Sequence, residues 1–363
     1  ADFIFLCKST NGKIVGNESP VLFQIRFKNE KKLVNNFSMK KILIIRFSSI
    51  GDIVLTSPIA RCVKLQVKNC ELHFLTKKSF ESIVANNPHI DKVYSIEKHI
   101  DEVIPQLKLE KYDFVIDLHY NIRSLLVRLK LNRPSFKFNK TNLKKWLMVN
   151  WKIKKKPNTH IVDRYFKAVR KLGVRNDGLG LDFFIPESQE VSLSTLPATH
   201  QNGYIAFVIG AKHFTKRMPP EKILSICKKI TQPIIFLGGP EDKELALYLT
   251  KEIGPNCYNA CGIYSLQQSA SLVKQAKKVI THDTGLMHIA AAFKKDIISI
   301  WGSTIPEFGM SPYFPGNSKA GIYIEVADLA CRPCSKIGFS KCPKGHFKCM
   351  KDISEAQIIS ALA

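Results

Sequence analysis

The feature that most constrains the fold is a regular alternation of short apolar runs with amphipathic helical stretches. Ile42–Ile45 is a continuous apolar run, which is typical of a parallel strand covered on both faces. Further strands are predicted at 72–75, 93–96 and 114–117, and then at 204–209, 234–237, 278–281 and 297–300. Because helical stretches separate these strands, the sequence predicts a doubly wound α/β fold.

The chain is long enough for two domains, each with its own core. It has 363 residues, and a loop rich in Gly, Asp, Ser and Pro runs from Gly173 to about Asn202. We place the boundary there, which gives domains at 39–190 and 191–363, two α/β halves with a cleft between them. Residues 1–38 show no clear period and precede Met39, so we expect an extension outside the core fold.

The charge of the chain favours anionic partners. Lys and Arg number 55 against 30 Asp and Glu, a formal net charge of +25, which attracts nucleic acid, anionic membranes or phosphorylated substrates. No window offers about 18 uninterrupted apolar residues, so we expect no membrane-spanning helix. The first residues lack a basic secretory start, and the 10 cysteines do not resemble a secreted disulfide scaffold. We therefore expect a soluble cytosolic protein drawn to anions.

One strand-turn-helix stretch predicts a phosphate site. The strand at 278–281 ends in Asp283-Thr284-Gly285, and Leu286, Ile289 and Phe293 then follow at helical spacing. The first N–H groups of such a helix suit an anion, and Gly285 lets a ligand approach the backbone. The alternative is a tight strand-to-helix connection without a ligand.

A basic segment covers residues 118–162, where no acidic residue occurs. It combines Lys144 and Lys145 with Trp146 and Trp151, a pattern that suits an anionic membrane surface or a phosphorylated lipid head group. A solvated basic face is the plainer alternative. A nucleic-acid groove is the third, but no nucleic-acid fold is recognisable, so we predict no nucleic-acid partner.

Several motifs together resemble one enzyme family. They are Lys40–Pro58 with Ser48-Ser-Ile-Gly-Asp52, Asp117–Ser124, Asp283-Thr-Gly-Leu-Met-His288 with Ile300–Pro306, and the cysteines from Cys331 to Cys349. The chain from Met39 onward resembles the lipopolysaccharide heptosyltransferases of glycosyltransferase family 9. The resemblance implies a GT-B fold, with two Rossmann-like domains: an N-terminal one for the acceptor and a C-terminal one for the nucleotide sugar.

The resemblance also implies a reaction and a location. The reaction is inverting transfer of heptose from ADP-heptose to the inner core of lipopolysaccharide on lipid A. It needs no cofactor besides the donor, and it takes place at the cytosolic face of the inner membrane, with the enzyme held peripherally on an anionic surface.

Asp52 matches the family's catalytic base. A carboxylate at the tip of the first strand can accept the proton of an attacking acceptor hydroxyl. Capping the following helix is the alternative role, and the two roles are compatible. For the acceptor we assign Ser49, Gly51, Arg123, Lys144 and Lys145.

The donor residues follow from the same resemblance. Lys216 matches the phosphate lysine, with Lys212 as the weaker candidate, and Thr284, Gly285 and Leu286 supply backbone N–H groups. Glu241 and Asp242 share the ribose assignment, and capping the next helix is an equal alternative. Asp283 orders the loop or touches the donor sugar, and His288 contacts the nucleotide or a phosphate or is an internally satisfied helix histidine.

The closing cysteines have the composition of a metal site, although no metal is required for catalysis. The spacing of Cys331, Cys334, Cys342 and Cys349, with His346 nearby, suits a structural zinc. Reduced packing thiols or a disulfide are the alternatives. Two other functions stay open: a family 9 transferase with another nucleotide sugar or acceptor, and a non-catalytic polyanion- or membrane-binding protein of this fold. An NAD(P) oxidoreductase is disfavoured, because the turn after the first strand lacks the Gly-x-Gly-x-x-Gly pattern.

Overall fold

Two parallel sheets organise the protein. The computed structural model describes residues 39–152, 159–316 and 321–363, and Lys40–Ala363 form one unit. The predicted extension at 1–38 and Lys154, Lys155 and Lys156 of the basic segment lie outside the described residues. The α/β class predicted from the alternation of strands and helices is confirmed.

The first sheet has the order β3-β2-β1-β4-β5, with every neighbouring pair parallel. Its strands are β1 (Lys40–Ile45), β2 (Cys70–Lys77), β3 (Lys92–Ile96), β4 (Phe114–Asp117) and β5 (Ser135–Lys137). Its helices are α2 (Ile50–Val54), α3 (Ser57–Gln66), α4 (Ile104–Leu109), α5 (Ile122–Leu131), α6 (Asn142–Asn150) and α7 (Ile161–Val169). Side chains of α3 and α7 cover one face of this sheet, and those of α4 and α5 cover the other.

The second sheet has the order β11-β10-β9-β6-β7-β8 and is also parallel. Its strands are β6 (Ile205–Val208), β7 (Ile234–Leu237), β8 (Cys257–Asn259), β9 (Lys278–His282), β10 (Asp296–Trp301) and β11 (Gly321–Glu325). Its helices are α8 (Ala198–Gln201), α9 (Pro220–Cys227), α10 (Lys243–Ile253), α11 (Leu266–Gln275), α12 (Gly285–Ala292), α13 (Lys348–Lys351) and α14 (Glu355–Leu362). Side chains of α9, α10, α13 and α14 pack on one face, and those of α11 and α12 on the other.

Both sheets reverse their strand order beside their first strand. The reversal lies between β1 and β4 in the first sheet and between β6 and β9 in the second. Ligands of open α/β sheets bind outside the carboxyl ends of the strands at such a point. The segments after β1, β4 and β9 are therefore the ones that position a site.

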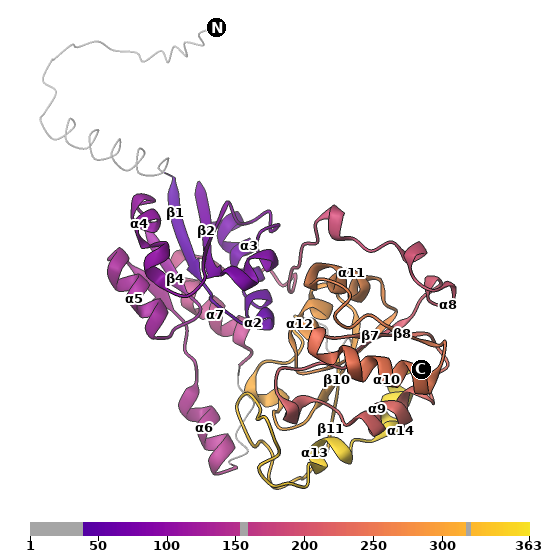
Figure 1. The fold of residues 1–363 in the computed structure, drawn as a ribbon. Helices are drawn as coiled ribbons and strands as arrows, with labels where there is room; N and C mark the ends of the chain where they lie inside the picture. The colour runs from indigo at the N-terminus through magenta and orange to yellow at the C-terminus, as the bar shows by residue number, and fades with distance from the viewer. Residues whose placement is uncertain (1–38, 153–158, 317–320) are drawn as a thin grey trace, which may run out of the picture. The chain divides into compact units, whose positions relative to one another are not determined.

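The two halves, here called the first and second lobes after their sheets, share a buried apolar cluster. It includes Ile59 and Tyr165 of the first lobe and Val279 and Met287 of the second. Helix α2 meets α12 in this region, and the two lie side by side in Figure 1. The last strand of the first sheet ends at Lys137 and the first strand of the second begins at Ile205, so the boundary at 190/191 stays a prediction within the long connection.

The structure divides one predicted helix. The apolar pattern from Ile53 to Val67 predicts a single helix, but the chain forms α2 and α3 with a break at Leu55–Thr56. Pro58 stands in the first turn of α3. It has no N–H for a bond to the preceding turn and its ring crowds that turn, which ends α2 early.

Candidate active site

Asp52 lies in the first turn of α2, directly after β1. Ser49 is the N-cap of this helix, and its Oγ and backbone N donate to Asp52 Oδ2 at 2.8 and 3.3 Å. Asp52 thus completes a capping box, the arrangement in which an N3 carboxylate accepts from the N-cap backbone. The capping alternative predicted for Asp52 is present, and it leaves the carboxylate about a quarter exposed at the carboxyl edge of the first sheet (23%).

A buried arginine sets the charge state of Asp52. Nη2 of Arg46 lies 2.7 Å from Asp52 Oδ1, and Arg46 is fixed by bonds to the Ser48 carbonyl and the Tyr165 hydroxyl. Burial raises the pKa of Asp52, but the charge of Arg46 and the bonds from Ser49 outweigh it, so this pKa lies below its usual range. Asp52 is therefore a carboxylate at neutral pH.

The N-terminus of α12 faces Asp52 from the second lobe. A Cβ added at Gly51 would stand 2.5 Å from His288 Cδ2 and 3.4 Å from the Gly285 Cα. A Cβ added at Gly285 would stand 2.7 Å from Ile50 Cγ2. Only residues without a side chain allow this approach, so Gly51 and Gly285 bring the carboxylate of one lobe and the helix N-terminus of the other to one place.

Lys216 and Asp283 form the polar wall beside α12. Lys216 Nζ lies 2.5 Å from Asp283 Oδ2, which also accepts from Thr304 Oγ1 at 2.9 Å. Thr284 is the N-cap of α12, and its hydroxyl lies 3.3 Å from that of Thr281. Thr284, Gly285 and Leu286 are partly accessible, so the first N–H groups of α12, Lys216 and Asp283 are brought together. Lys212 is exposed four residues before Lys216.

His288 is buried between the two lobes. It is 3% exposed, and its Nδ1 has no hydrogen-bond partner among the described residues. Burial lowers the pKa of His288 to about 4, against the opposing influence of Asp283 and Asp52. A ring with one unbonded buried nitrogen differs from an internally satisfied helix histidine, and contact of His288 with the donor stays a prediction.

The loop after β7 separates the two acids that share the ribose prediction. Asp242 is 1% exposed, accepts from Gly239 N at 2.9 Å and pairs with Arg217 at 2.8 Å. Both of its oxygens are therefore engaged, one within the loop and one by Arg217. Glu241 is exposed, and its carboxylate folds over Gly239. Asp242 therefore shapes the loop and Glu241 is the exposed acid of the two, while the contact of either with a ribose stays a prediction.

A half-buried lysine on α6 and a buried arginine on α7 line the site. Arg164 is 5% exposed; its Nη1 donates to the Asn139 carbonyl and Thr141 Oγ1, but its Nε and Nη2 have no partner among the described residues. Lys145 lies nearby with Nζ 5.6 Å from the Phe308 ring centre. Burial lowers the pKa of Lys145 to about 8, the charge of Arg164 lowers it further, and Asp52 and Asp283 oppose both.

Sequence reasoning missed Arg164, although the basic segment contained Lys145. A buried cation such as Arg164 is normally paired with an anion, and no ion pair within the described residues involves Arg164 or the half-buried Lys145. The signal in the sequence was weak, because Arg164 stands among apolar residues of an ordinary amphipathic helix. Lys145 faces this site and not the outer surface, where the basic pattern alone would have placed it.

The remaining predicted acceptor residues lie around the same edge. Ser49 is exposed and Gly51 buried. The Arg123 guanidinium lies 5.8 Å from the ring centre of Phe47, two residues after the end of β1. Lys144 is half-buried on α6.

The four C-terminal cysteines are neighbours, and none forms a disulfide. Cys334 Sγ donates to the Cys331 carbonyl at 3.1 Å, and Cys331 Sγ lies 3.8 Å from His346 Nε2. Burial and the other thiols raise the pKa of Cys334 to about 11 and that of Cys349 to about 12. Within the described residues, no three of these ligand atoms lie within 4.8 Å of one another. The zinc hypothesis stays a prediction.

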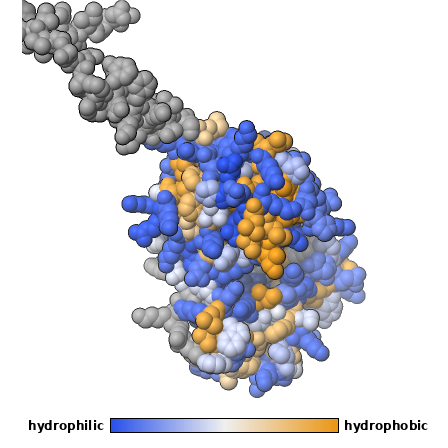
Figure 2. Space-filling model, turned by 90° about the vertical axis from the view of Figure 1, so that its left-hand side faces the viewer, coloured by the Kyte–Doolittle hydropathy of each residue, from blue (hydrophilic) through white to orange (hydrophobic). Residues whose placement is uncertain are grey.

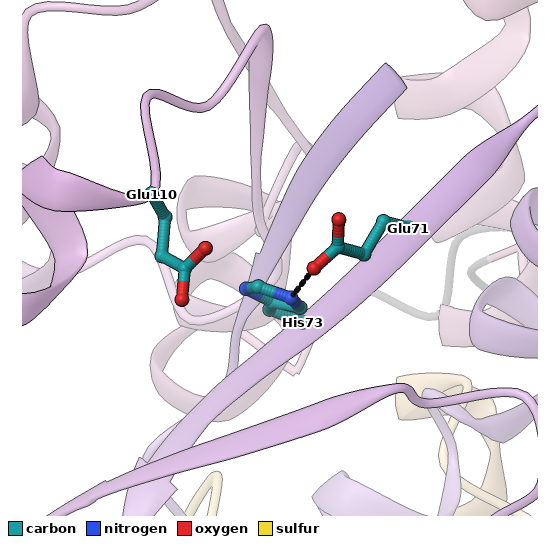
Figure 3. A group of neighbouring side chains, drawn as sticks. All are labelled: Glu71, His73 and Glu110. Atoms are coloured by element: carbon teal, nitrogen blue, oxygen red, sulfur yellow. Dashed lines mark hydrogen bonds and ion pairs between the residues drawn. The ribbon is translucent and has the colours of Figure 1, made fainter. Parts of the chain in front are cut away.

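The described residues contain one group with metal-like spacing, Glu71, His73 and Glu110 in the first lobe. Figure 3 shows His73 bonded to Glu71, with Glu110 approaching from the other side. Both ring nitrogens of His73 are engaged, by Glu71 at 2.9 Å and by the Tyr112 hydroxyl at 2.8 Å. Lys41 and Lys92 bond Glu110 and hold its pKa far below the usual range. This group is a satisfied ion-pair network and fits a metal poorly.

Comparison with known proteins decides the family. The model of glycosyltransferase family 9 (heptosyltransferase) matches residues 100–340, more than half of the chain. The chain belongs to glycosyltransferase family 9. The family predicted from the motifs is confirmed, and the protein is a glycosyltransferase.

Relatives and solved structures agree with this placement. Lipopolysaccharide heptosyltransferase 1 of Campylobacter coli is 26% identical over 291 residues, which cover 73% of this chain and 84% of that protein. The glycosyl transferase family 9 structure from Veillonella parvula DSM 2008 matches with a TM-score of 0.72 and 22% identity, covering 89% of this chain and 96% of that one. The E. coli heptosyltransferase WaaC with ADP matches with a TM-score of 0.59 and 20% identity, covering 89% and 98%. The predicted GT-B fold of this family 9 enzyme is confirmed.

Proposed function

We propose that this family 9 enzyme transfers heptose from ADP-heptose to the inner core of lipopolysaccharide, on an acceptor linked to lipid A, with inversion at the anomeric carbon. Relatives across most of the chain carry the name heptosyltransferase, which supports heptose as the transferred sugar. Support for an ADP-sugar donor comes from E. coli WaaC, whose structure contains ADP.

One observation carries the proposal: Asp52 and the N-terminus of α12 meet at the contact of Gly51 with His288 and Gly285. Sugar transfer needs a base for the incoming hydroxyl and a positive region for the departing diphosphate, held a few ångströms apart. The two lobes supply one each.

The reaction then runs as a single displacement. Asp52 accepts the proton of the acceptor hydroxyl as the oxygen attacks the anomeric carbon from the face opposite the diphosphate. The bond from that carbon to the diphosphate oxygen breaks, and ADP departs. The N–H groups of Thr284, Gly285 and Leu286, together with Lys216, stabilise the charge that develops on it. Lys216 and the helix dipole thus stabilise the negative charge of the departing diphosphate, and the proposed reaction needs no cofactor besides the donor.

The roles of the other residues follow from their placement. Glu241 holds the ribose, Asp283 fixes Lys216 while touching the donor sugar, and His288 packs beneath the donor against Gly51. Arg164 and Lys145 seat an anionic group of the acceptor, with Ser49, Arg123 and Lys144 at the rim. Lys212, exposed in the loop before Lys216, adds positive charge on the donor side.

We also propose that the enzyme works peripherally at the cytosolic face of the inner membrane. Its acceptor is anchored in lipid, and its net charge of +25 suits an anionic surface. No helix in the described part of the chain combines the length and the apolar character needed to cross a bilayer.

Purified protein incubated with ADP-heptose and a panel of truncated lipid-linked acceptors tests the proposal. We expect one heptose added to one acceptor, with the new bond of inverted configuration by NMR. Asp52→Asn should abolish this product while keeping ADP binding, as measured by calorimetry. Transfer of a different sugar from a parallel panel of nucleotide sugars would replace heptose in the proposal, and full turnover by Asp52→Asn would remove the base.

A further inference from the structure

Helix α5 presents an apolar stripe to the outside of the first lobe. Ile122, Leu125, Leu126 and Leu129 are 78%, 40%, 43% and 64% exposed. Their spacing of three, four and seven residues puts them on one side of the helix. In a surface helix of a soluble protein, that stripe normally faces the core.

The orientation of α5 is fixed by the opposite side of the helix. Val127 is fully buried, Ser124 Oγ donates to Asp117 Oδ2 at 2.8 Å, and Arg128 Nε lies 3.0 Å from the same carboxylate. Asp117 is itself buried at the end of β4. The helix cannot turn its leucines inward without breaking these contacts, so the exposed stripe is built into the fold.

Basic side chains flank the stripe. Arg123 and Lys130 lie on α5, and together with Lys98 and His99 they line an open hollow beside Ile122 and Leu126. Asp101 also lines it and pairs with Lys130. Figure 2 faces the side on which α5 lies in Figure 1, and apolar side chains gather there among charged ones. Exposed branched residues bordered by Lys and Arg suit the boundary between acyl chains and anionic head groups.

We propose that this surface, here called the α5 face (Ile122, Leu125, Leu126 and Leu129 with Arg123, Lys98 and Lys130), docks on a bilayer that contains anionic phospholipid. The inference rests on the proposed function, in which the acceptor is anchored in lipid. The chain enters α5 from the carboxyl edge of the first sheet, and Arg123 stacks on Phe47 beside the strand that leads to Asp52. Docking through this face therefore brings the acceptor side of the cleft to the head groups.

A second copy of the chain is a less suitable occupant. A two-fold contact places the same surface against itself, which would set the Lys98, Arg123 and Lys130 side chains of two copies against one another. An anionic bilayer pairs with the same charges, and it accepts the apolar stripe between them.

Flotation of the full-length protein with vesicles tests the proposal. We expect binding to vesicles of phosphatidylglycerol and phosphatidylethanolamine, much weaker binding to phosphatidylcholine vesicles, and a loss of binding as salt screens the charges. Leu125→Ser with Leu129→Ser should lower the partition coefficient at least about tenfold, because each exposed leucine loses its apolar contact. Lys98→Gln with Lys130→Gln should lower binding to the anionic vesicles alone.

Matched changes in the second lobe serve as controls. Leu247→Ser with Ile263→Ser removes two side chains of similar exposure, 63% and 54%, and Lys228→Gln with Lys251→Gln removes two exposed charges. These variants should bind vesicles like the natural protein. Equal binding by the Leu125/Leu129 variant and the natural protein would overturn the proposal, as would a dimer that dissociates in that variant while vesicle binding persists.

The assay separates this inference from the proposed reaction. Vesicle binding is measured without any sugar donor, so a wrong donor leaves the result intact. If the reaction is correct and the α5 face is not, the Leu125/Leu129 variant will turn over a lipid-embedded acceptor as fast as a soluble, deacylated one. If both hold, it will be slowed only on the embedded acceptor.

Discussion

The pH dependence of acceptor capture gives the sharpest test of the site, and it turns on Lys145. Burial and the neighbouring Arg164 lower the pKa of this amine to about 8. Below that pH the amine is charged and can pair with an anionic acceptor group; above it, the charge is lost. Because kcat/KM reports ionisations of the free enzyme, kcat/KM for the acceptor should fall as pH rises through about 8.

The size of the effect follows from the titration. Near pH 7 roughly nine tenths of the Lys145 amines are protonated, and near pH 9 roughly one tenth, so kcat/KM should drop about tenfold for each further pH unit. A bound anion raises the pKa, so the matching limb in kcat should lie at higher pH. Asp52 adds no acid limb near neutrality, because its pKa is lowered from 3.8.

Variants assign the limb to this residue. Lys145→Arg should move it beyond about pH 10, because a guanidinium stays charged. Lys145→Gln should flatten it and lower kcat/KM at neutral pH by about ten- to a hundredfold, the value of one charge-assisted contact. Lys167→Gln, an exposed change on the adjacent α7, is the control. If the Lys145→Arg profile superimposes on that of the natural enzyme, the limb belongs to another group and the cation pair does not seat the acceptor.

Three other predictions concern the lobes. Gly285→Ala should lower kcat/KM about a hundredfold, since its Cβ would stand 2.7 Å from Ile50 Cγ2 and 2.8 Å from Ile50 Cβ and displace the lobes. Ile50→Gly removes both contacts and should partly restore the rate, whereas Gly321→Ala, with neighbours no nearer than 3.4 Å, should change little. An undiminished rate in Gly285→Ala would contradict the close approach. Glu241→Gln should weaken ADP binding, measured by calorimetry, more than Asp242→Asn does, once each affinity is corrected for the fraction of unfolded protein. A larger loss of affinity in Asp242→Asn would assign the ribose contact to Asp242. Arg61→Met should cost roughly 3 kcal/mol in urea unfolding, because Arg61 is 4% exposed and its loss leaves Asp177 and Asp182 without their cation; a cost near zero would mean that water replaces it.

The strands of both sheets were largely predictable from local pattern. The run Ile234–Leu237 and the strand ending at Asp117 appear as predicted, because a short run of buried residues, four in the first and three in the second, leaves few alternatives to a covered parallel strand. The short strands β5, β8 and β11 were not predicted, because three to five residues of mixed exposure show no clear hydrophobic period. These strands form because they hydrogen-bond to the adjacent strands β4, β7 and β10, and that pairing cannot be predicted from the local sequence.

The site was predictable where its polar residues stand shortly after the end of a strand. Asp52, Lys216 and the turn at Asp283 are brought together as the motifs suggested, although their chemical roles stay predictions. Three features of the site depend on tertiary contacts and could not be predicted. They are the direction in which Lys145 points, the unpaired nitrogens of Arg164, and the different exposure of Glu241 and Asp242. The outward stripe of α5 is the strongest example, because an identical pattern in most helices would face the core.

The contact of Gly51 with His288 has a consequence for engineering. Enzymes built from two lobes invite chimeras in which one lobe is exchanged to change the sugar donor. Here the fit is set by two positions that must stay free of side chains, one contributed by each partner, and by the imidazole wedged between them. An exchange that imports a bulkier residue at either position would yield two folded halves that bind their own ligands and never bring them within reaction distance.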